Sequence, residues 1–267
     1  MEATAKRAAF RALHEGPHLF LLPNPWDIGS AKLLEQLGFE ALATTSSGFA
    51  QTLGRLDQTV SRGELVEHVR ALAAAVSIPL NVDSEQCYPR EDGGIARTVE
   101  LLADAGAAGF SLEDYDPVDD AILGLDVAVE RVAAAVAANR ALPEPMVVTA
   151  RAENHLHGKD DLDDTIARLV AYRDAGADCV FAPGLRDLGE IGRLVSAVGV
   201  PVNVLAWPGG PVAEELEGVG VRRISTGSWL ARDAYGYLVR SATALRDTGA
   251  LAFEGGIESN LLRAALG

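Results

Sequence analysis

The chain has 267 residues, 48% hydrophobic and 23% charged, so it can bury a substantial core and does not resemble a disordered segment. Its formal net charge of −15 argues against nucleic acid and anionic membranes as partners, because both require a basic surface, but not against a small anionic substrate. The N-terminus lacks a signal-peptide pattern, and no apolar run reaches membrane length. The only cysteines, Cys87 and Cys179, form neither a disulfide framework nor a zinc motif. We therefore expect a single cytoplasmic domain over residues 1–267.

The sequence repeats one unit: a short apolar run, a loop, an amphipathic helical pattern and a Gly-centred turn. In chain order, the predicted strands are 18–25, 41–47, 79–85, 108–114, 146–153, 178–184, 201–207 and 222–228. Helical patterns between them include 61–77, 94–106 and 163–176. Several helices are predicted to end at a left-handed glycine, namely Gly38, Gly106, Gly176 and Gly220.

Strict alternation of strand and helix predicts a parallel sheet. Eight units in about 250 residues fit a closed (β/α)8 TIM barrel better than an open doubly wound sheet. No linker divides the chain, and no strand is followed by the G-x-G-x-x-G motif of a Rossmann domain.

Polar residues gather where the predicted strands end. In 78–91, "IPLNVDSEQCYPRE", alternation along the strand places Asp83 and Glu85 on one face, and two adjacent carboxylates require a cation or a proton between them. The next strand ends in Glu113, and the fifth contains Arg151 and Glu153. Because barrel active sites lie at the carboxyl ends of the strands, we expect these groups to converge at one mouth.

The chemistry of these acids favours a hard divalent cation. Asp83, Glu85 and Glu113 supply only oxygen ligands, as Mg²⁺ or Mn²⁺ prefers, and Mg²⁺ binds one or two carboxylates directly and others through water. Zinc is disfavoured because no histidine or cysteine cluster accompanies the acids. The alternative is a salt-bridge network with Arg151. With a metal present, Arg151 is instead the natural clamp for a substrate carboxylate or phosphonate.

Two glycine-rich loops, 206–211 ("AWPGGP") and 225–228 ("STGS"), support a rival enzyme class. Barrels often bind phosphate after strands seven and eight, so a phosphosugar isomerase ranks second. His155 and His157 follow the fifth strand and are either catalytic or solvated loop residues.

Taken in order, the motifs resemble the isocitrate lyase/phosphoenolpyruvate mutase superfamily, in a form similar to 2-methylisocitrate lyase. The resemblance covers roughly residues 20 to 250 and includes "PNPWDIGSAKLLEQLGFEALATTSSGFAQTLGRLD", "NVDSE", "LED", "TARAEN" and "PVNVLAWPGGP". It implies a Mg²⁺-dependent barrel that makes or breaks C–C or P–C bonds next to an oxyanion. Substrates of this family are 2-hydroxy or 2-oxo acids and phosphonates.

The resemblance also implies roles for individual residues. The metal ligands would be Asp83, Glu85 and Glu113, with Asp57 associated with the metal. Mg²⁺ and Arg151 would hold the acid and stabilise the enolate or aci-carboxylate that bond cleavage leaves. The implied catalytic residues are Arg151, Glu113 and Asp57, and the implied substrate-binding residues are Trp26, Ser46, Ser47, Gly48, Arg151 and Asn203.

The chain departs from the family after Glu113. The lyases have a Lys-Cys-Gly-His gate there, with Cys as general acid, whereas residues 115–132 contain no Lys, Cys or His. The phosphonate enzymes' version of that loop is missing too. Pro183 stands where the lyases have Glu and the mutases have His, and Leu205 stands where the lyases have a substrate-binding Thr. Cys87 stands where the family usually has Gly. Tyr88, Tyr115 and Cys87 are alternative proton donors.

These features predict a Mg²⁺-dependent carbon–carbon lyase or decarboxylase for a small 2-oxo or 2-hydroxy (di)carboxylic acid. The alternatives are a phosphoenolpyruvate mutase or phosphonopyruvate hydrolase type of P–C enzyme, and a non-catalytic barrel that binds 2-oxo acids.

The resemblance further implies assembly into a homodimer or homotetramer, in which subunits exchange the last barrel helix. The predicted final helix, 228–249, has apolar positions around much of its circumference, as burial against a partner requires. A helix packed only on its own barrel would have a similar pattern.

Overall fold

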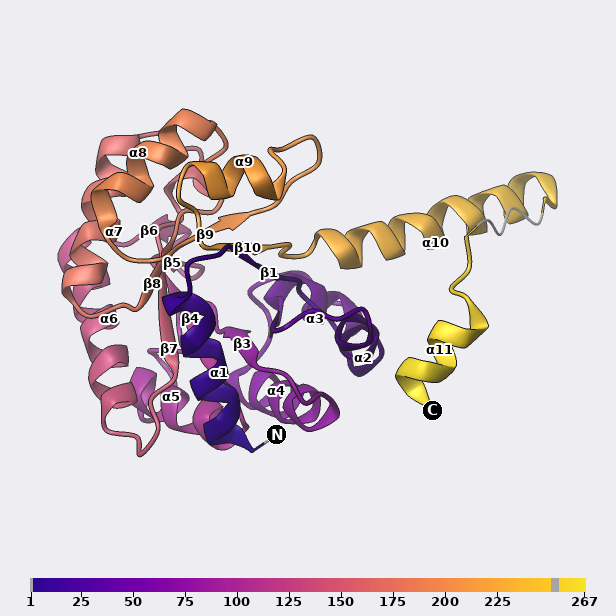
Figure 1. Cartoon of the computed structure of the whole chain (residues 1–267), viewed down its shortest axis with the longest axis horizontal. Helices are drawn as coiled ribbons and strands as arrows, with labels where there is room; N and C mark the ends of the chain where they lie inside the picture. Colours follow the sequence, from indigo (N-terminus) through magenta and orange to yellow (C-terminus); the bar gives the residue numbers. More distant parts are fainter. Residues whose placement is uncertain (1, 251–254) are drawn as a thin grey trace.

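The computed structural model describes residues 2–250 and 255–267, and its centre is an eight-stranded parallel sheet curved into a nearly closed barrel (Figure 1). The sheet order is β1-β10-β9-β8-β7-β4-β3-β2. At the seam between the two end strands, the Ala43 N–H donates to the Pro23 carbonyl (3.0 Å). The strands are β1 (Phe20–Leu22), β2 (Leu42–Ala43), β3 (Leu80–Asp83), β4 (Gly109–Glu113), β7 (Val147–Arg151), β8 (Cys179–Phe181), β9 (Val202–Leu205) and β10 (Arg223–Ser225). Each predicted strand region contains one of them, so the (β/α)8 prediction is confirmed.

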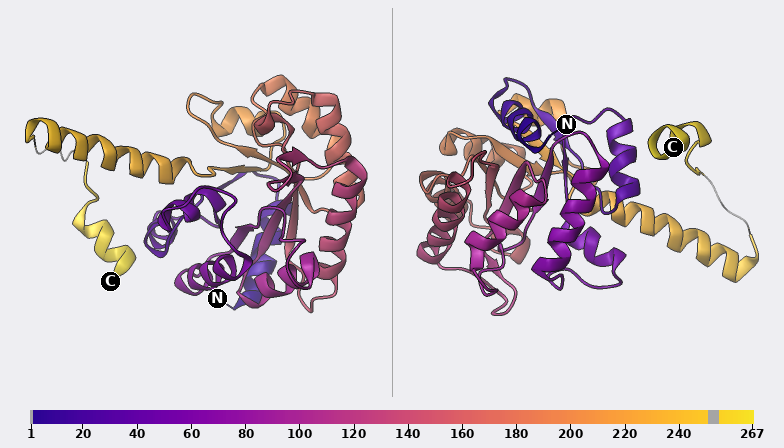
Figure 2. Two further views of the ribbon diagram at one scale, coloured as in Figure 1. Left: turned by 180° about the vertical axis from the view of Figure 1, so that it is seen from behind. Right: turned by 90° about the horizontal axis from the view of Figure 1, so that it is seen from below.

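Helices follow the strands and surround the barrel (Figures 1 and 2). Local sequence sets where they begin: Asp27 forms a capping box at the start of α2, and Ser61 forms one at the start of α4. The glycines predicted to end helices at positions 38, 106, 176 and 220 all have positive φ, between 90° and 105°. The helices are α1 (Ala3–Glu15), α2 (Ile28–Gln36), α3 (Ser46–Thr52), α4 (Arg62–Ala75), α5 (Gly94–Asp104), α6 (Leu125–Arg140), α7 (Leu162–Asp174), α8 (Leu188–Val198), α9 (Ala213–Gly218), α10 (Trp229–Thr248) and α11 (Ser259–Leu266), with the 3-10 helix η1 (Asn154–His157).

Helix α1 closes the amino-terminal end of the barrel. Phe10 is fully buried, and the edges of the Phe10, His14 and Phe20 rings meet at centroid distances of 4.6 to 6.2 Å. Gly109 at the start of β4 leaves room for Phe10, because a Cβ there would lie 2.6 Å from the ring. The barrel interior is therefore sealed below by α1.

Helix α10 leaves the barrel instead of covering it (Figures 1 and 2). Of its 20 residues only Ala231 and Ser241 are buried, whereas Leu238, Val239 and Leu245 are exposed. Helix α11 then returns to contact α2. The last barrel helix thus does not pack along its own barrel, which was one of the two explanations for its apolar pattern. No helix in the described ranges has the length and apolar character needed to cross a bilayer.

The segment after Glu113 forms a small antiparallel hairpin of β5 (Tyr115–Asp116) and β6 (Ala121–Ile122). The buried Asp116 carboxylate accepts from Arg90 (2.7 Å) and Arg131 (3.5 Å). The Tyr115 ring stacks on His157 with centroids 4.0 Å apart. These contacts attach the hairpin to the barrel body at the position where the lyases have their gate.

Candidate active site

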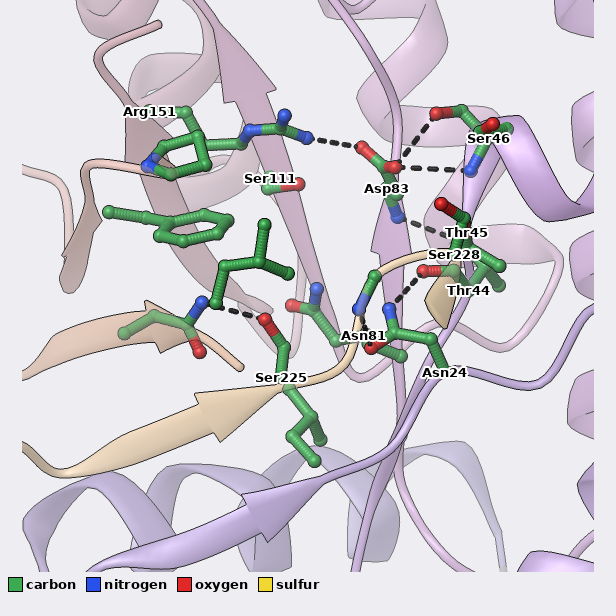
Figure 3. A pocket seen from close by; sticks show the side chains of 18 of the residues that line it. Asn24, Thr44, Thr45, Ser46, Asn81, Asp83, Ser111, Arg151, Ser225 and Ser228 are labelled. Carbon is green, nitrogen blue, oxygen red and sulfur yellow. Dashed lines mark hydrogen bonds and ion pairs between the residues drawn. The ribbon is translucent and has the colours of Figure 1, made fainter. Parts of the chain in front are cut away.

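A cavity of about 160 Å³ opens at the carboxyl ends of the barrel strands (Figure 3). This volume is well below the roughly 300–1,000 Å³ of pockets for drug-sized ligands, so the cavity suits a small organic molecule. Its apolar wall consists of Leu22, Ala43, Leu156, Phe181, Pro183 and Leu205. Its polar lining consists of Asn24, Thr44, Thr45, Ser46, Ser47, Asp57, Asn81, Asp83, Ser111, Arg151, Asn203, Arg223, Ser225 and Ser228.

Arg151 is the centre of the acid cluster at the mouth. Its Nη1 lies 2.7 Å from Asp83 Oδ1, its Nη2 lies 3.2 Å from Glu113 Oε2, and its Nε lies 2.9 Å from Glu153 Oε1. The guanidinium also lies over the Phe181 ring, 5.4 Å from the centroid. The predicted convergence of acids on Arg151 is therefore present, and so is the salt-bridge network that was the alternative to a metal.

The charges in this cluster do not balance. Burial raises the pKa of the Glu113 carboxyl well above its usual range, although the charge of Arg151 opposes this effect. Burial likewise raises the pKa of Glu153, against the same opposing charge. One arginine thus faces more buried carboxylates than it can neutralise, and the cluster favours an additional positive charge or proton.

Asp83 connects the acid cluster to the start of α3. Its Oδ2 accepts from the Ser46 backbone N–H (3.1 Å) and from Ser46 Oγ (2.9 Å), as Figure 3 shows. The Gly48 N–H donates to Thr45 Oγ1 (3.2 Å). Two N–H groups among these predicted substrate-binding residues therefore already have partners inside the protein, while Ser46 and Ser47 line the cavity.

Glu85 does not lie where strand alternation places it. Strand β3 ends at Asp83, and Glu85 sits in the following turn with a left-handed backbone (φ 50°). Alternation correctly pairs Asn81 with Asp83, because both line the cavity, but the turn sets the direction of Glu85. The Glu85 side chain is only 4% exposed as a residue, and its Oε1 is buried without a hydrogen-bond partner. Burial, followed by the charges of Asp83 and Asp57, raises its pKa to about 8.

The residues around Glu85 fit a divalent cation bound through few protein ligands. Across the described residues, no three His, Cys, Asp or Glu side chains are arranged to ligate one ion directly. The unpartnered Glu85 oxygen and the excess of carboxylates nevertheless match the preference of Mg²⁺ for one or two carboxylates plus water. Asp83 and Glu85 are the residues that would hold such an ion, with Glu113 acting through Arg151 or through water.

The other predicted site residues divide into two groups. Asp57 and Asn203 line the cavity, and partial desolvation, then the Asp83 charge, raises the pKa of Asp57. Trp26 and Gly48 do not line it: Trp26 packs behind α3, where a Cβ on Gly48 would lie 3.2 Å from Trp26 Cβ. Trp26 therefore supports the loop from behind.

The predicted alternative proton donors lie outside the cavity lining. Cys87 is fully buried, and burial raises the pKa of its thiol to about 12. The Tyr88 hydroxyl donates to the Val60 carbonyl (3.1 Å), and the Tyr115 hydroxyl donates to Asp120 (2.7 Å). His155 contacts Thr165 and Asp160, while His157 stacks on Tyr115.

Several residues that build the site had no predicted role. Glu153, which follows Arg151 by two residues at the end of the predicted fifth strand, is the third carboxylate partner of Arg151. Asn24 connects three strand ends: its Oδ1 accepts from the N–H groups of Thr226 and Gly227 (2.8 and 2.9 Å), and its Nδ2 donates to the Thr44 carbonyl (2.7 Å). Arg223 forms part of the cavity floor. A polar or basic residue inside an apolar strand was the available signal for Arg223.

Comparison with known proteins shows what this architecture is related to. The family model of phosphoenolpyruvate phosphomutase matches residues 10–246. A solved putative lyase/mutase from Burkholderia cenocepacia J2315 is 47% identical, with a TM-score of 0.93 over 98% of this chain and 95% of that one.

Several curated relatives have named activities, and two of them show the range. The oxaloacetate decarboxylase of Paraburkholderia xenovorans is 32% identical over 77% of this chain and 70% of its own length. The probable 2-methylisocitrate lyase 2 of Corynebacterium glutamicum is 29% identical over 92% of this chain and 82% of its own. The family match spans most of the barrel and the whole acid cluster. The chain belongs to the phosphoenolpyruvate phosphomutase family, within the isocitrate lyase/phosphoenolpyruvate mutase superfamily.

Proposed function

We propose that the protein is a Mg²⁺-dependent lyase that cleaves a carbon–carbon bond in a small 2-oxo or 2-hydroxy (di)carboxylic acid, most simply by decarboxylation of a 2-oxo diacid. The observation that carries this proposal is the cavity itself: about 160 Å³, at the carboxyl ends of the strands, with Arg151 held among three carboxylates at its mouth. The relatives named oxaloacetate decarboxylase and probable 2-methylisocitrate lyase 2 support the same reaction class.

The residues of the chain have separable roles in this reaction. Asp83 and Glu85 would hold the ion, which, when bound, stabilises the negative charge that develops on substrate oxygens. Arg151 is fixed in orientation by Asp83, Glu113 and Glu153, and its remaining N–H donors are available to a substrate oxygen. The apolar wall of Phe181, Pro183 and Leu205 limits access of water to the reacting carbon.

Asp57 is the group that we assign to returning a proton after bond cleavage. Among the described lining residues, Asp57 and Asp83 are the carboxyls, and Asp83 is ion-paired with Arg151. The raised pKa of Asp57 suits a group that must be protonated part of the time. Decarboxylation of a 2-oxo diacid releases CO₂ and leaves an enolate, and Asp57 would protonate the carbon that lost CO₂ in place of the gate cysteine.

The first experiment is a mass-spectrometric screen of 2-oxo, 2-hydroxy and phosphono acids, with and without Mg²⁺. In the Asp83→Ala variant we expect an intact fold but a loss of Mg²⁺-dependent turnover on the order of 10²-fold or more. Glu130→Ala, on the exposed face of α6, is the matched control and keeps its activity. Unchanged turnover in Asp83→Ala would refute this assignment.

The family match to phosphoenolpyruvate phosphomutase favours a second candidate, a P–C bond enzyme. Phosphorus NMR of phosphonopyruvate incubated with the protein and Mg²⁺ tests it directly, because cleavage or transfer creates a new phosphorus signal. An unchanged spectrum eliminates this candidate.

We also propose that the protein assembles by exchanging α10 between copies, forming a homodimer or homotetramer. Leu238 is 60% exposed and Val239 63% exposed on this projecting helix. A groove between α3 and α10, lined by Gln51, Arg55, Tyr235 and Val239, offers a complementary surface. Light scattering should give a multimeric mass that falls in Leu238→Glu/Val239→Glu, and a monomeric wild type would refute the exchange.

A further inference from the structure

Gln58 lies in the loop of residues 53–61 between α3 and α4, and its backbone is left-handed (φ 62°). Its side chain reaches into the acid cluster, where Nε2 donates to Glu113 Oε1 (2.7 Å). Its backbone N–H donates to Asp57 Oδ1 (3.1 Å). Gln58 therefore contacts both an acid that the resemblance assigns to the metal and the carboxyl to which we assign the return of a proton.

The oxygen of the Gln58 amide lacks a donor. Within the described residues, Gln58 Oε1 is buried without a hydrogen-bond partner, and so is Glu85 Oε1. The two residues are neighbours: burial raises the pKa of the Glu85 carboxyl, and the nearby backbone N–H of Gln58 opposes this rise. A buried acceptor without a donor costs free energy, so two of them in one acid cluster indicate a bound group that donates to both.

The hydration shell of a divalent cation supplies donors of this kind. Mg²⁺ keeps several of its waters when it binds to a protein, and these waters donate to carboxylate and amide oxygens around the ion. A neutral amide suits this position better than another carboxylate, because Asp83, Glu85 and Glu113 already repel one another. The Nε2 end of the same amide fixes Glu113, whose other oxygen lies 3.2 Å from Arg151 Nη2.

Much of the loop that carries Gln58 faces solvent, and Leu56 is 83% exposed. Arg55 attaches the outer part of the loop to the start of α4 through an ion pair with Glu64 (2.9 Å). The Gln58 side chain attaches the part next to Asp57 to the acid cluster. Because Gln58 and Asp57 are adjacent and share a hydrogen bond, a group that fixes the Gln58 amide also fixes Asp57.

We propose that Gln58 is a positioning residue that couples binding of the divalent cation to the placement of Asp57. Its Oε1 accepts from the hydration shell of the ion, its Nε2 holds Glu113, and the loop that carries Asp57 becomes ordered when the ion binds. This inference rests on the proposed function, which supplies the ion and the role of Asp57, and it adds a residue that had no predicted role. The bound ion then prepares the proton donor as well as the substrate oxygens.

The test combines isothermal titration calorimetry of Mg²⁺ with amide hydrogen exchange of residues 53–61. In the wild type, Mg²⁺ should bind and slow exchange in this loop. Gln58→Leu, which removes both polar ends of the side chain, should weaken Mg²⁺ binding about tenfold and lose the slowing. Gln58→Glu keeps an acceptor oxygen, so it should bind Mg²⁺ at least as tightly as the wild type but melt at a lower temperature without the ion. Gln36→Leu, at the exposed end of α2, is the matched control and should change neither quantity.

Equal Mg²⁺ affinity in folded Gln58→Leu and in the wild type overturns the inference and leaves the proposed reaction standing. Mg²⁺ binding by Gln58→Glu that is as weak as binding by Gln58→Leu also overturns it. Exchange in residues 53–61 of the wild type that does not change with Mg²⁺ overturns it without any variant, so an unfolded Gln58→Leu does not weaken the test. A wild type that does not bind Mg²⁺ refutes both this inference and the proposed function. The full expected pattern in a protein that converts no acid in the Mg²⁺ screen supports the role of Gln58 and refutes the proposed reaction.

Discussion

Two buried arginines, Arg151 and Arg223, occupy opposite ends of one cavity and have opposite surroundings. Arg151, at the mouth, contacts three carboxylates, and Arg223, at the floor, contacts three neutral acceptors. The mouth therefore has an excess of negative charge and the floor an excess of positive charge. The charge of Arg151 is neutralised by its carboxylate partners, whereas the charge of Arg223 is not neutralised by its uncharged partners.

The two ends also respond to acid in opposite directions. Glu85, close to Asp83, has a raised pKa and binds a proton more readily in the folded state, whereas His14, which contacts Arg223, has a lowered pKa and resists protonation. Acidification therefore favours the folded state through Glu85 and disfavours it through His14.

The largest effect is expected from Arg151→Gln, which would leave Asp83, Glu113 and Glu153 without their cation. Removing one partner of a buried ion pair typically costs about 3–5 kcal/mol, and turnover should be lost. Because the remaining acids take up protons more readily in the folded state, stability should recover partly between pH 7 and pH 5 in urea unfolding experiments. Arg151→Lys keeps the charge and should lose less stability than Arg151→Gln. A loss of stability in Arg151→Gln that does not change with pH would contradict this explanation.

A smaller effect of opposite sign is expected from Glu85→Gln in the metal-free protein. With a folded-state pKa of about 8 and an unfolded value near 4.5, the native state at pH 7 holds a proton that the unfolded state has released. At about 1.4 kcal/mol per pH unit, this difference costs about 3 kcal/mol, which glutamine removes. Chemical denaturation should show the gain at pH 7 and its disappearance near pH 4.5.

The same variant should also lose most of the stabilisation that Mg²⁺ gives to the wild type in thermal melting. Glu130→Gln on exposed α6 is the control, and we expect it to change neither quantity. A metal-free Glu85→Gln protein that is less stable than the wild type at pH 7 would show that Glu85 is ionised and paired.

The smallest effect on stability is expected from His14→Gln, beneath Arg223. His14 must stay neutral in the folded state, with a pKa of about 3 against 6.5 when unfolded, so its contribution is complete above pH 6.5 and is lost as the pH falls toward 3. At pH 5 the loss is about 2 kcal/mol. His14→Gln still offers an acceptor to Arg223 and should flatten the stability profile between pH 7 and pH 5, whereas His18→Gln, at the surface, should not. Parallel profiles for His14→Gln and the wild type would contradict the assignment.

Local patterns were sufficient to predict the barrel. Each strand combines an apolar run with a left-handed glycine before it or a polar end after it, and the four predicted glycine stops all have positive φ. Rules of this kind operate over a few residues, so a single sequence reveals them.

The site was harder to predict wherever a turn or a long side chain intervenes. Glu85, Cys87 and Tyr88 have left-handed backbones, and such a turn breaks the alternation that would have placed Glu85 beside Asp83 on the strand face. Arg223 is the first residue of β10, at the end of the strand away from the mouth, but its long side chain reaches the cavity. Neither direction follows from residue type or spacing alone.

Helix α10 begins at Trp229, immediately after Gly227 and Ser228, which line the cavity. Its first turn is stiffened by the Arg232 guanidinium over the Trp229 ring, 4.6 Å from the centroid. Because this helix of 20 residues begins directly after two lining residues, a copy that binds its exposed side chains would also hold the segment that carries Gly227 and Ser228. If copies exchange α10 as we propose, the affinity of the protein for substrate is therefore expected to fall on dilution, as neighbouring copies separate.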